Sequence, residues 1–270
     1  MAKSPQKQPV TGWQRTLVIG IDQFIYLFSK HWLAVFNSVI AIYVALPILA
    51  PVLMHAGIER PARIIYTIYS PMCHQMASRS FFLFGEQYAY PREIAPTSLK
   101  PIEAYLDDIP EFAGVPESNW VAFTLAARAF LGNSQMGYKM ALCERDIGIY
   151  GAVLLGGLLY AVLRKRVKPL PVVAFVLVGM GPIGLDGFSQ LFGYYALPID
   201  GSEPSGFTAV LHMIFPLRES TPFLRLFTGM LFGLMLVWLA YPRIEEGMRQ
   251  TRMELERKLG RINALPFRKG

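Results

Sequence analysis

The chain has 270 residues, of which 53% are hydrophobic and 17% are charged, and its formal net charge is +7. A soluble protein usually carries about 25% charged residues, so this composition excludes an ordinary soluble globular protein. The apolar excess instead indicates segments that cross a lipid bilayer.

The apolar stretches predict the elements in chain order. Residues 13–28 mix apolar side chains with Arg15 and Asp22, which is typical of an amphipathic helix lying in the membrane interface. We therefore predict an all-α, polytopic membrane protein with about four transmembrane helices and an interfacial N-terminal helix. The predicted spans are residues 33–54, 147–163, 170–185 and 226–241.

These spans divide the chain into three parts. Residues 1–32 form a cytoplasmic or interfacial segment, residues 33–241 the transmembrane domain, and residues 242–270 a cytoplasmic amphipathic tail. Residues 85–119 hold seven acidic residues and five prolines, and we expect a surface excursion rather than a folded unit. Residues 120–131 are apolar but short and carry Arg128, which favours a helix packed on the bundle over a fifth span.

Basic residues orient the predicted bundle, because Lys and Arg accumulate on the cytoplasmic side. They cluster near the N-terminus, in the link 164–168 and in the C-terminal tail, and four spans place all three clusters on one side. We therefore expect a multi-pass cell-membrane protein with both ends in the cytoplasm and residues 85–119 outside. The positive charge then reflects topology, and we expect no nucleic-acid partner.

This topology brings ionisable side chains from separate segments to the outer face. Asp186 lies roughly 24 Å along a helix that starts inside, and a carboxylate at that depth is costly. The candidate metal ligands are Cys73, His74 and Cys143; the candidate catalytic residues are Asp146 and Asp186; the candidate ligand-binding or cofactor-binding residues are Arg79, Arg145, Arg225 and Gln190.

Local patterns refine these positions. Ser70-Pro71 predicts a helix start, which would put Cys73 in a first turn that favours thiolate. Cys143 and Asp146 share a face if the second span begins early. The glycines and prolines between residues 179 and 187 predict a kinked or locally unwound helix.

Four interpretations of the two cysteines stay open. They form a disulfide on the oxidising face, or they bind a metal with His74 and Asp146 or Asp186. Zinc is the metal that such Cys/His/Asp mixtures favour. Alternatively they are inert small hydrophobic residues, or they form a redox-active pair. For Asp186 we expect a metal or a basic partner among Arg79, Arg145 and Arg225, because an isolated carboxylate would be neutral there.

The ordered motifs resemble a family of small prokaryotic integral membrane proteins, named as a domain of unknown function (DUF2085). The resemblance spans roughly residues 66–241, and residues 86–119 depart from it. It implies a polytopic helical protein and supplies no activity. The motifs are Cys73-His74-Gln75, Cys143-x-Arg145-Asp146-x-Gly148, Gly181-Pro182-x-Gly184-x-Asp186-Gly187 with Gln190, and Arg225-x-x-Thr228-Gly229.

Two classes of function remain. In the first, the outer polar site binds a metal and acts on a lipid or another membrane-embedded substrate. In the second, the chain is a non-catalytic accessory subunit of a membrane complex, the cysteines form a disulfide, and the polar loop and the tail contact other membrane protein subunits. Whether the protein is an enzyme depends on which class holds.

Overall fold

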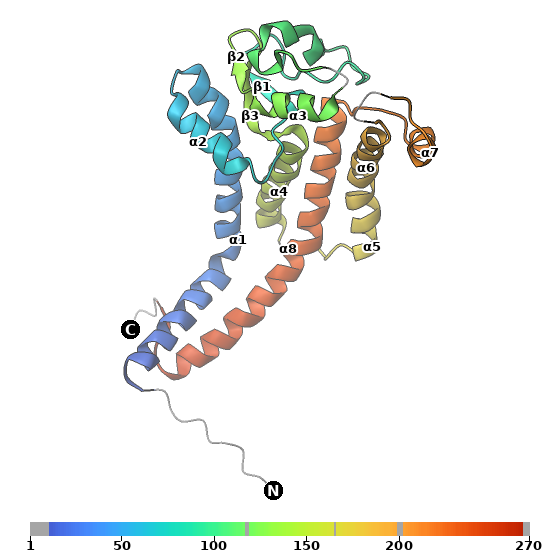
Figure 1. Cartoon of the computed structure of the whole chain (residues 1–270). Coiled ribbons are helices and arrows are strands. Elements are labelled where there is room, and N and C mark those ends of the chain that lie inside the picture. The colour runs from blue at the N-terminus through green and yellow to red at the C-terminus, as the bar shows by residue number, and fades with distance from the viewer. Residues whose placement is uncertain (1–10, 117–118, 165, 199–201, 267–270) are drawn as a thin grey trace.

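The computed structural model describes residues 11–116, 119–164, 166–198 and 202–266. Within these ranges, four helical segments are long and apolar enough to cross a membrane (Figure 1). The prediction of a mainly helical, polytopic membrane protein is confirmed. The four segments are α1 (Gly12–His55), α4 (Glu144–Leu163), Val172–Tyr195, and α8 (Pro222–Arg261).

The helices α1 and α8 are longer than a bilayer requires. Their 44 and 40 residues extend about 66 and 60 Å, against a hydrocarbon core of about 30 Å. The expected interfacial helix at residues 13–28 is therefore not a separate element, because residues 28–33 contain no glycine or proline to end it. The tail likewise continues α8.

The projecting parts of α1 and α8 lie side by side and slant away from the rest of the bundle (Figure 1). Lys258 Nζ lies 2.6 Å from Asp22 Oδ2, and Gln23 Nε2 donates to the Ala264 carbonyl oxygen at 2.7 Å. We call this pair, residues 12–31 and 246–261, the stalk. The stalk lies at the end of the bundle opposite the polar site.

Glycines bring α4 and α8 into backbone contact. A Cβ atom added at Gly148, Gly229 or Gly233 would lie 2.5, 2.4 or 2.3 Å from a backbone oxygen of the other helix. Small residues allow membrane helices to approach this closely. The contact fixes the start of α4 against the start of α8, where the polar site lies.

The third span is helical throughout but not uniformly α-helical. A short α5 (Val172–Ala174) leads into a π-helical turn, η4 (Phe175–Met180), and then into α6 (Gly181–Tyr195). Pro182 has no N–H to bond to the preceding turn, and the wider turn accommodates its ring. The predicted distortion is present, but it precedes Asp186, which lies in regular helix.

The residues between the first two spans form a small folded unit, which we call the cap (Figure 1, top). After α2 (Glu59–Tyr69), the chain builds an antiparallel sheet in the order β1-β3-β2. A further helix, α7 (Phe207–Ile214), lies before α8. The elements of the cap are η1 (Ala77–Arg79), β1 (Ser80–Leu83), η2 (Ile102–Asp108), η3 (Pro110–Phe112), α3 (Trp120–Ala129), β2 (Gly132–Asn133) and β3 (Gly137–Cys143).

The expectation that residues 85–119 are an unfolded surface excursion is wrong. Ile102, Tyr105, Ile109 and Phe112 are buried in a core shared with α3. Their spacing is helical, but Pro101 and Pro110 divide the segment into short 3₁₀ helices. The short helix expected at residues 120–131 is present as α3, but its buried face packs within the cap rather than on the bundle.

Candidate functional site

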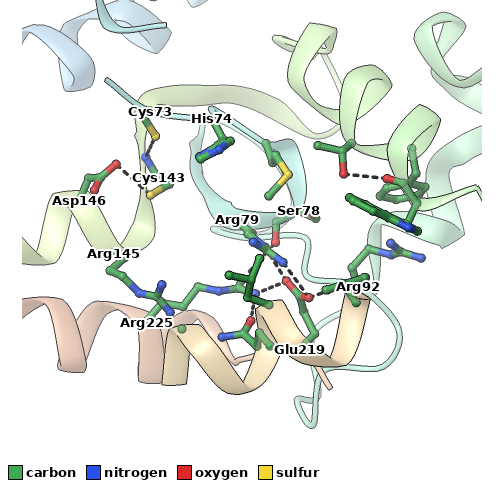
Figure 2. A pocket seen from close by; sticks show the side chains of 18 of the residues that line it. Cys73, His74, Ser78, Arg79, Arg92, Cys143, Arg145, Asp146, Glu219 and Arg225 are labelled. Carbon is green, nitrogen blue, oxygen red and sulfur yellow. Dashed lines mark hydrogen bonds and ion pairs between the residues drawn. The ribbon is translucent and has the colours of Figure 1, made fainter. Parts of the chain in front are cut away.

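A cavity of about 600 Å³ lies where the cap meets the ends of α4 and α6 (Figure 2). Every predicted site residue except Asp186 lines it, and Asp186 lies behind Arg145. Residues from the loop 72–79, α3, α4, α6 and the start of α8 contribute to its walls. The structure therefore brings these segments together, while the roles assigned to the side chains stay predictions.

Cys73, Cys143 and Asp146 form a compact group, here called the thiol cluster. The two Sγ atoms and one Asp146 carboxylate oxygen lie within 4.8 Å of one another, and both cysteines are free. Cys143 Sγ donates to Asp146 Oδ2 at 3.1 Å, so helix α4 does begin early enough to align these two residues. His74 is exposed in the pocket lining and does not belong to the cluster.

Cys73 is not in a helix, so the predicted helix start at Ser70-Pro71 is wrong. Helix α2 ends at Tyr69, and the chain then turns into an extended loop. Cys73 Sγ accepts instead from the backbone N–H groups of Cys143 at 3.2 Å and Gln75 at 3.4 Å.

Gln75 explains why the loop holds this shape. Its φ of 51° is left-handed, a conformation that non-glycine residues rarely adopt. Its buried side chain donates to the carbonyl oxygens of Tyr66 at 3.0 Å and Ala141 at 2.9 Å. These contacts tie the Cys-His-Gln loop to α2 and to strand β3.

Lys139 supports the same loop, and sequence reasoning missed it. The side chain is fully buried, and Nζ donates to the carbonyl oxygens of Gln75 and Arg128. Burial lowers the pKa of the Lys139 ammonium group to about 7. Its signal was a lysine inside an otherwise apolar strand of seven residues.

The Cys143 thiol lies close to the Cys73 thiol and to the Asp146 carboxylate. Its hydrogen bond with Cys73, its burial and the neighbouring Asp146 raise the pKa of Cys143 well above its usual value. Cys143 therefore carries its proton and donates it to Asp146 Oδ2.

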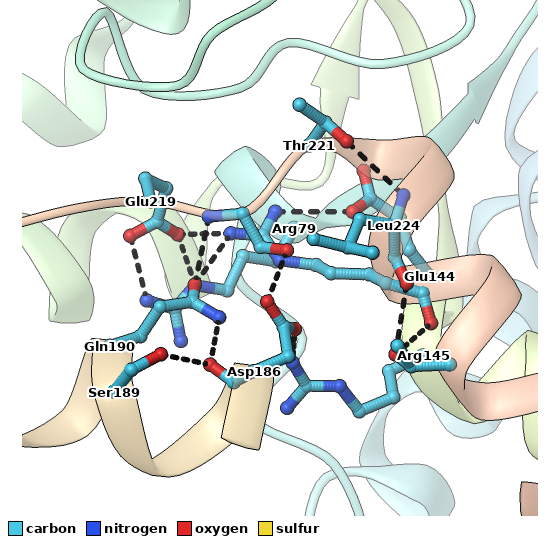
Figure 3. Close-up of polar contacts among 12 residues, drawn as sticks. Arg79, Glu144, Arg145, Asp186, Ser189, Gln190, Glu219, Thr221 and Leu224 are labelled. Carbon is cyan, nitrogen blue, oxygen red and sulfur yellow. Dashed lines mark hydrogen bonds and ion pairs between the residues drawn. The ribbon is translucent and has the colours of Figure 1, made fainter. Parts of the chain in front are cut away.

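A buried ion-pair network forms the floor of the pocket (Figure 3). Glu219 accepts from Arg79 Nε at 2.6 Å, from Tyr194 Oη at 2.7 Å and from Arg225. Arg225 also donates to Glu144 at 3.1 Å. Burial acts to raise the pKa of Glu219, but Arg79 and Arg225 outweigh it and hold that pKa below its usual value.

Glu144 and Glu219 were not among the predicted site residues. Glu144 stands between Cys143 and Arg145, at the unnamed position of that motif. Glu219 lies in a loop with little apolar context to mark it as buried. Both side chains are fully buried, so each depends on its arginine partners.

The prediction that Asp186 has a basic partner is confirmed for Arg145, one of the three candidates. The second partner, Arg218, was not among them, and Arg79 and Arg225 pair with Glu219 instead. Arg145 donates to one carboxylate oxygen; Arg218, at 3.1 Å, and Ser220, at 2.7 Å, donate to the other. Gln190 Nε2 donates to the Asp186 backbone carbonyl at 2.8 Å. Arg218 was missed because it lies in a loop, and the sequence does not indicate where a loop residue lies relative to helix α6.

The comparisons with known proteins agree with the motifs. Residues 127–239 match the family described as "Predicted membrane protein (DUF2085)". A protein of Methanocaldococcus jannaschii, named as uncharacterized, is 24% identical over 220 residues, which cover 79% of this chain and 92% of that protein. No solved structure matches. Over residues 127–239 the chain is therefore similar to this family of predicted membrane proteins, which agrees with the resemblance drawn from the motifs.

Proposed function

We propose that the thiol cluster binds a divalent metal ion, zinc in the first place, and that the pocket presents this ion to a lipid or another membrane-embedded substrate. One observation carries the proposal. Two thiols and a carboxylate oxygen, from segments about seventy residues apart, lie within 4.8 Å of one another at the wall of a 600 Å³ cavity.

The donor set suits zinc. Sulfur from cysteine and oxygen from aspartate are zinc ligands, and three protein ligands with one open position are typical of catalytic zinc sites. The two N–H groups that contact Cys73 Sγ would act as outer partners that orient the ligand. Binding would release the proton that Cys143 now shares with Asp146.

The surrounding residues then take distinct parts. A bound metal would supply Lewis-acid chemistry at its open position. Asp146 serves as a ligand, and exposed His74 is free to exchange protons at the pocket mouth. Asp186 positions Arg145, because its carboxylate already accepts from Arg145, Arg218 and Ser220.

A second candidate function rests on the proximity of the two free thiols. Oxidation would join the loop 72–79 to the start of α4 by a disulfide. The buried ion pairs would then serve a purely structural purpose in an accessory subunit of a membrane complex.

We also propose that the pocket faces outward and both ends of the chain face the cytoplasm. The basic link near Arg164 and the basic stalk lie at the opposite end of the bundle, which supports this orientation. A reporter fused after Arg166 is expected to be cytoplasmic, and one inserted near Asp108 to be external. The reverse pattern would contradict the orientation.

Metal analysis of the purified full-length protein tests the main proposal. We expect about one zinc per chain, lost in Cys73→Ser, Cys143→Ser and Asp146→Asn. Asp108→Asn is the matched control, because Asp108 is an exposed carboxylate of the cap. Wild-type protein that neither retains nor takes up zinc would contradict the proposal. A mass two daltons below the reduced chain would favour the disulfide.

A further inference from the structure

We infer that the same pocket binds the anionic head group of a membrane lipid, a phosphate or a carboxylate, through Arg145 and Trp120. The inference deepens the proposed function by naming the ligand class of its pocket, and it rests on that function only for the location. The contacts that carry it do not involve the thiol cluster.

Two hydrogen-bond donors in the pocket lining have no acceptor among the described residues. They are Arg145 Nε and Trp120 Nε1, and both atoms are shielded from water. A buried donor without a partner costs free energy, which an oxygen atom of a bound group would recover. Arg145 and Trp120 line the same cavity and each carries a donor that requires an acceptor, so we assign one oxygen-rich group to both.

The excess positive charge around Arg145 also favours an anionic ligand. Arg145 and Arg218 share the single carboxylate of Asp186, so this group of three side chains carries one excess positive charge. The Arg145 side chain lines the cavity and is 26% exposed, so part of it is accessible to a ligand. Gly187 makes room for it, because a Cβ there would lie 3.3 Å from Arg145 Nη1.

The aromatic residues at the mouth indicate that the anion belongs to a lipid. The Trp120 ring lies 6.2 and 6.4 Å from the rings of Tyr194 and Tyr195, and such clusters are typical of the membrane–water interface. Met72, Leu191 and Tyr195 line the pocket and are all exposed. An acyl chain could leave the pocket past these apolar side chains into the bilayer.

Titration of the full-length protein in detergent, followed by native mass spectrometry, tests the inference. The probes are dioleoylphosphatidylglycerol, which is anionic, and dioleoylphosphatidylcholine, which is zwitterionic. We expect the anionic lipid to bind at least about tenfold more tightly. We expect Trp120→Phe, which keeps the ring and removes the N–H donor, to weaken that binding about tenfold.

Trp238→Phe is the matched control. Trp238 lies near the middle of α8 and does not line the pocket, and its Nε1 donates to the Lys168 carbonyl oxygen at 3.0 Å, so the same chemical change occurs outside the pocket. This variant is expected to bind the anionic lipid as the wild type does.

A second pair of variants separates ligand contact from loss of stability. Arg145→Lys and Arg218→Lys each remove one guanidinium partner of Asp186, but only Arg145 lines the pocket. We expect Arg145→Lys to lose the preference for the anionic lipid and Arg218→Lys to keep it.

Equal binding of the two lipids, unchanged binding by Trp120→Phe, or equal effects of the two lysine variants would overturn the inference. Inorganic phosphate is titrated separately. Tight binding of phosphate without any preference between the lipids would assign the site to a free anion and reject the lipid. Normal zinc content without a preference for the anionic lipid would contradict the lipid inference and leave the zinc proposal standing. A preference for the anionic lipid in a protein that takes up no zinc would contradict the zinc proposal and leave the lipid inference standing.

Discussion

Two positions along α8 carry ion pairs of the same chemical type in different surroundings. At its start, beside the cap, Arg225 is 3% exposed and its partners Glu144 and Glu219 are fully buried. Near its middle, where the stalk begins, Glu245 accepts from Arg164 and from Trp32 Nε1, but the Arg164 side chain is 33% exposed. The same helix therefore carries a network that is shielded from water and a pair that is partly accessible to water.

The difference determines what each group contributes. Exposed ion pairs contribute little, because water screens them and two long side chains lose entropy. Buried pairs add little net stability as a whole, yet removing one partner leaves an uncompensated charge in a medium of low polarity. We therefore expect folding to depend far more on the network at the cap than on the pair near the stalk.

The largest expected effect comes from Glu219→Gln. The change keeps the shape but leaves Arg79 and Arg225 with one carboxylate, that of Glu144, instead of two. We expect the free energy of unfolding to fall by about 3–5 kcal/mol, measured by denaturation in detergent.

The pH dependence provides a check on the same residue. The pKa of Glu219 is lowered in the folded protein, so its contribution is complete above the usual value of 4.5 and is lost as the pH falls below it. The difference in stability between wild type and Glu219→Gln should shrink in that range. A difference that persists at low pH would show that shape, rather than charge, matters at this position.

Asp186→Asn should have a smaller effect. Its partners Arg145 and Arg218 are 26% and 37% exposed, so water can solvate part of the positive charge that the substitution leaves unpaired. We expect a loss of about 1–3 kcal/mol in the same measurement. A loss as large as that of Glu219→Gln would mean that the pocket excludes water more strongly than these exposures indicate.

Arg164→Gln should have the smallest effect, a loss of less than about 1 kcal/mol. Glu245 keeps its hydrogen bond from Trp32 at 2.8 Å, and its remaining charge is accessible to water. Raising the salt concentration should reduce even this difference. A loss comparable to that of Asp186→Asn would contradict the proposed contrast between the start and the middle of α8.

The spans could be predicted from the sequence because a bilayer imposes a length on every apolar segment. The ends of α1 and α8 could not, because helix continuation beyond the membrane depends on pairing between segments more than 200 residues apart. The cap was missed for a different reason. Its prolines and acidic residues concealed an apolar repeat at residues 102, 105, 109 and 112 that builds a core only with α3.

The candidate site shows a similar division. Cys73, Cys143 and Asp186 could be selected because their chemistry is unusual at a membrane boundary. The arginine partners of Asp186 could not be predicted, because Arg145, Arg218 and Arg225 have the same chemistry and only the folded structure decides which of them reach this carboxylate. The parts played by Gln75 and Lys139 depend on a left-handed turn and on strand register, which no spacing rule reveals.

The glycine contact between α4 and α8 has a mechanical consequence. A Cβ at Gly148, Gly229 or Gly233 would lie 2.3–2.5 Å from a backbone oxygen of the other helix, so neither helix can slide or rotate on the other without collision. Cys143 and Asp146, at the start of α4, therefore keep a fixed position relative to Arg225 at the start of α8. Movement that admits or releases a ligand is expected from α6, which lines the pocket and follows the π-helical turn η4.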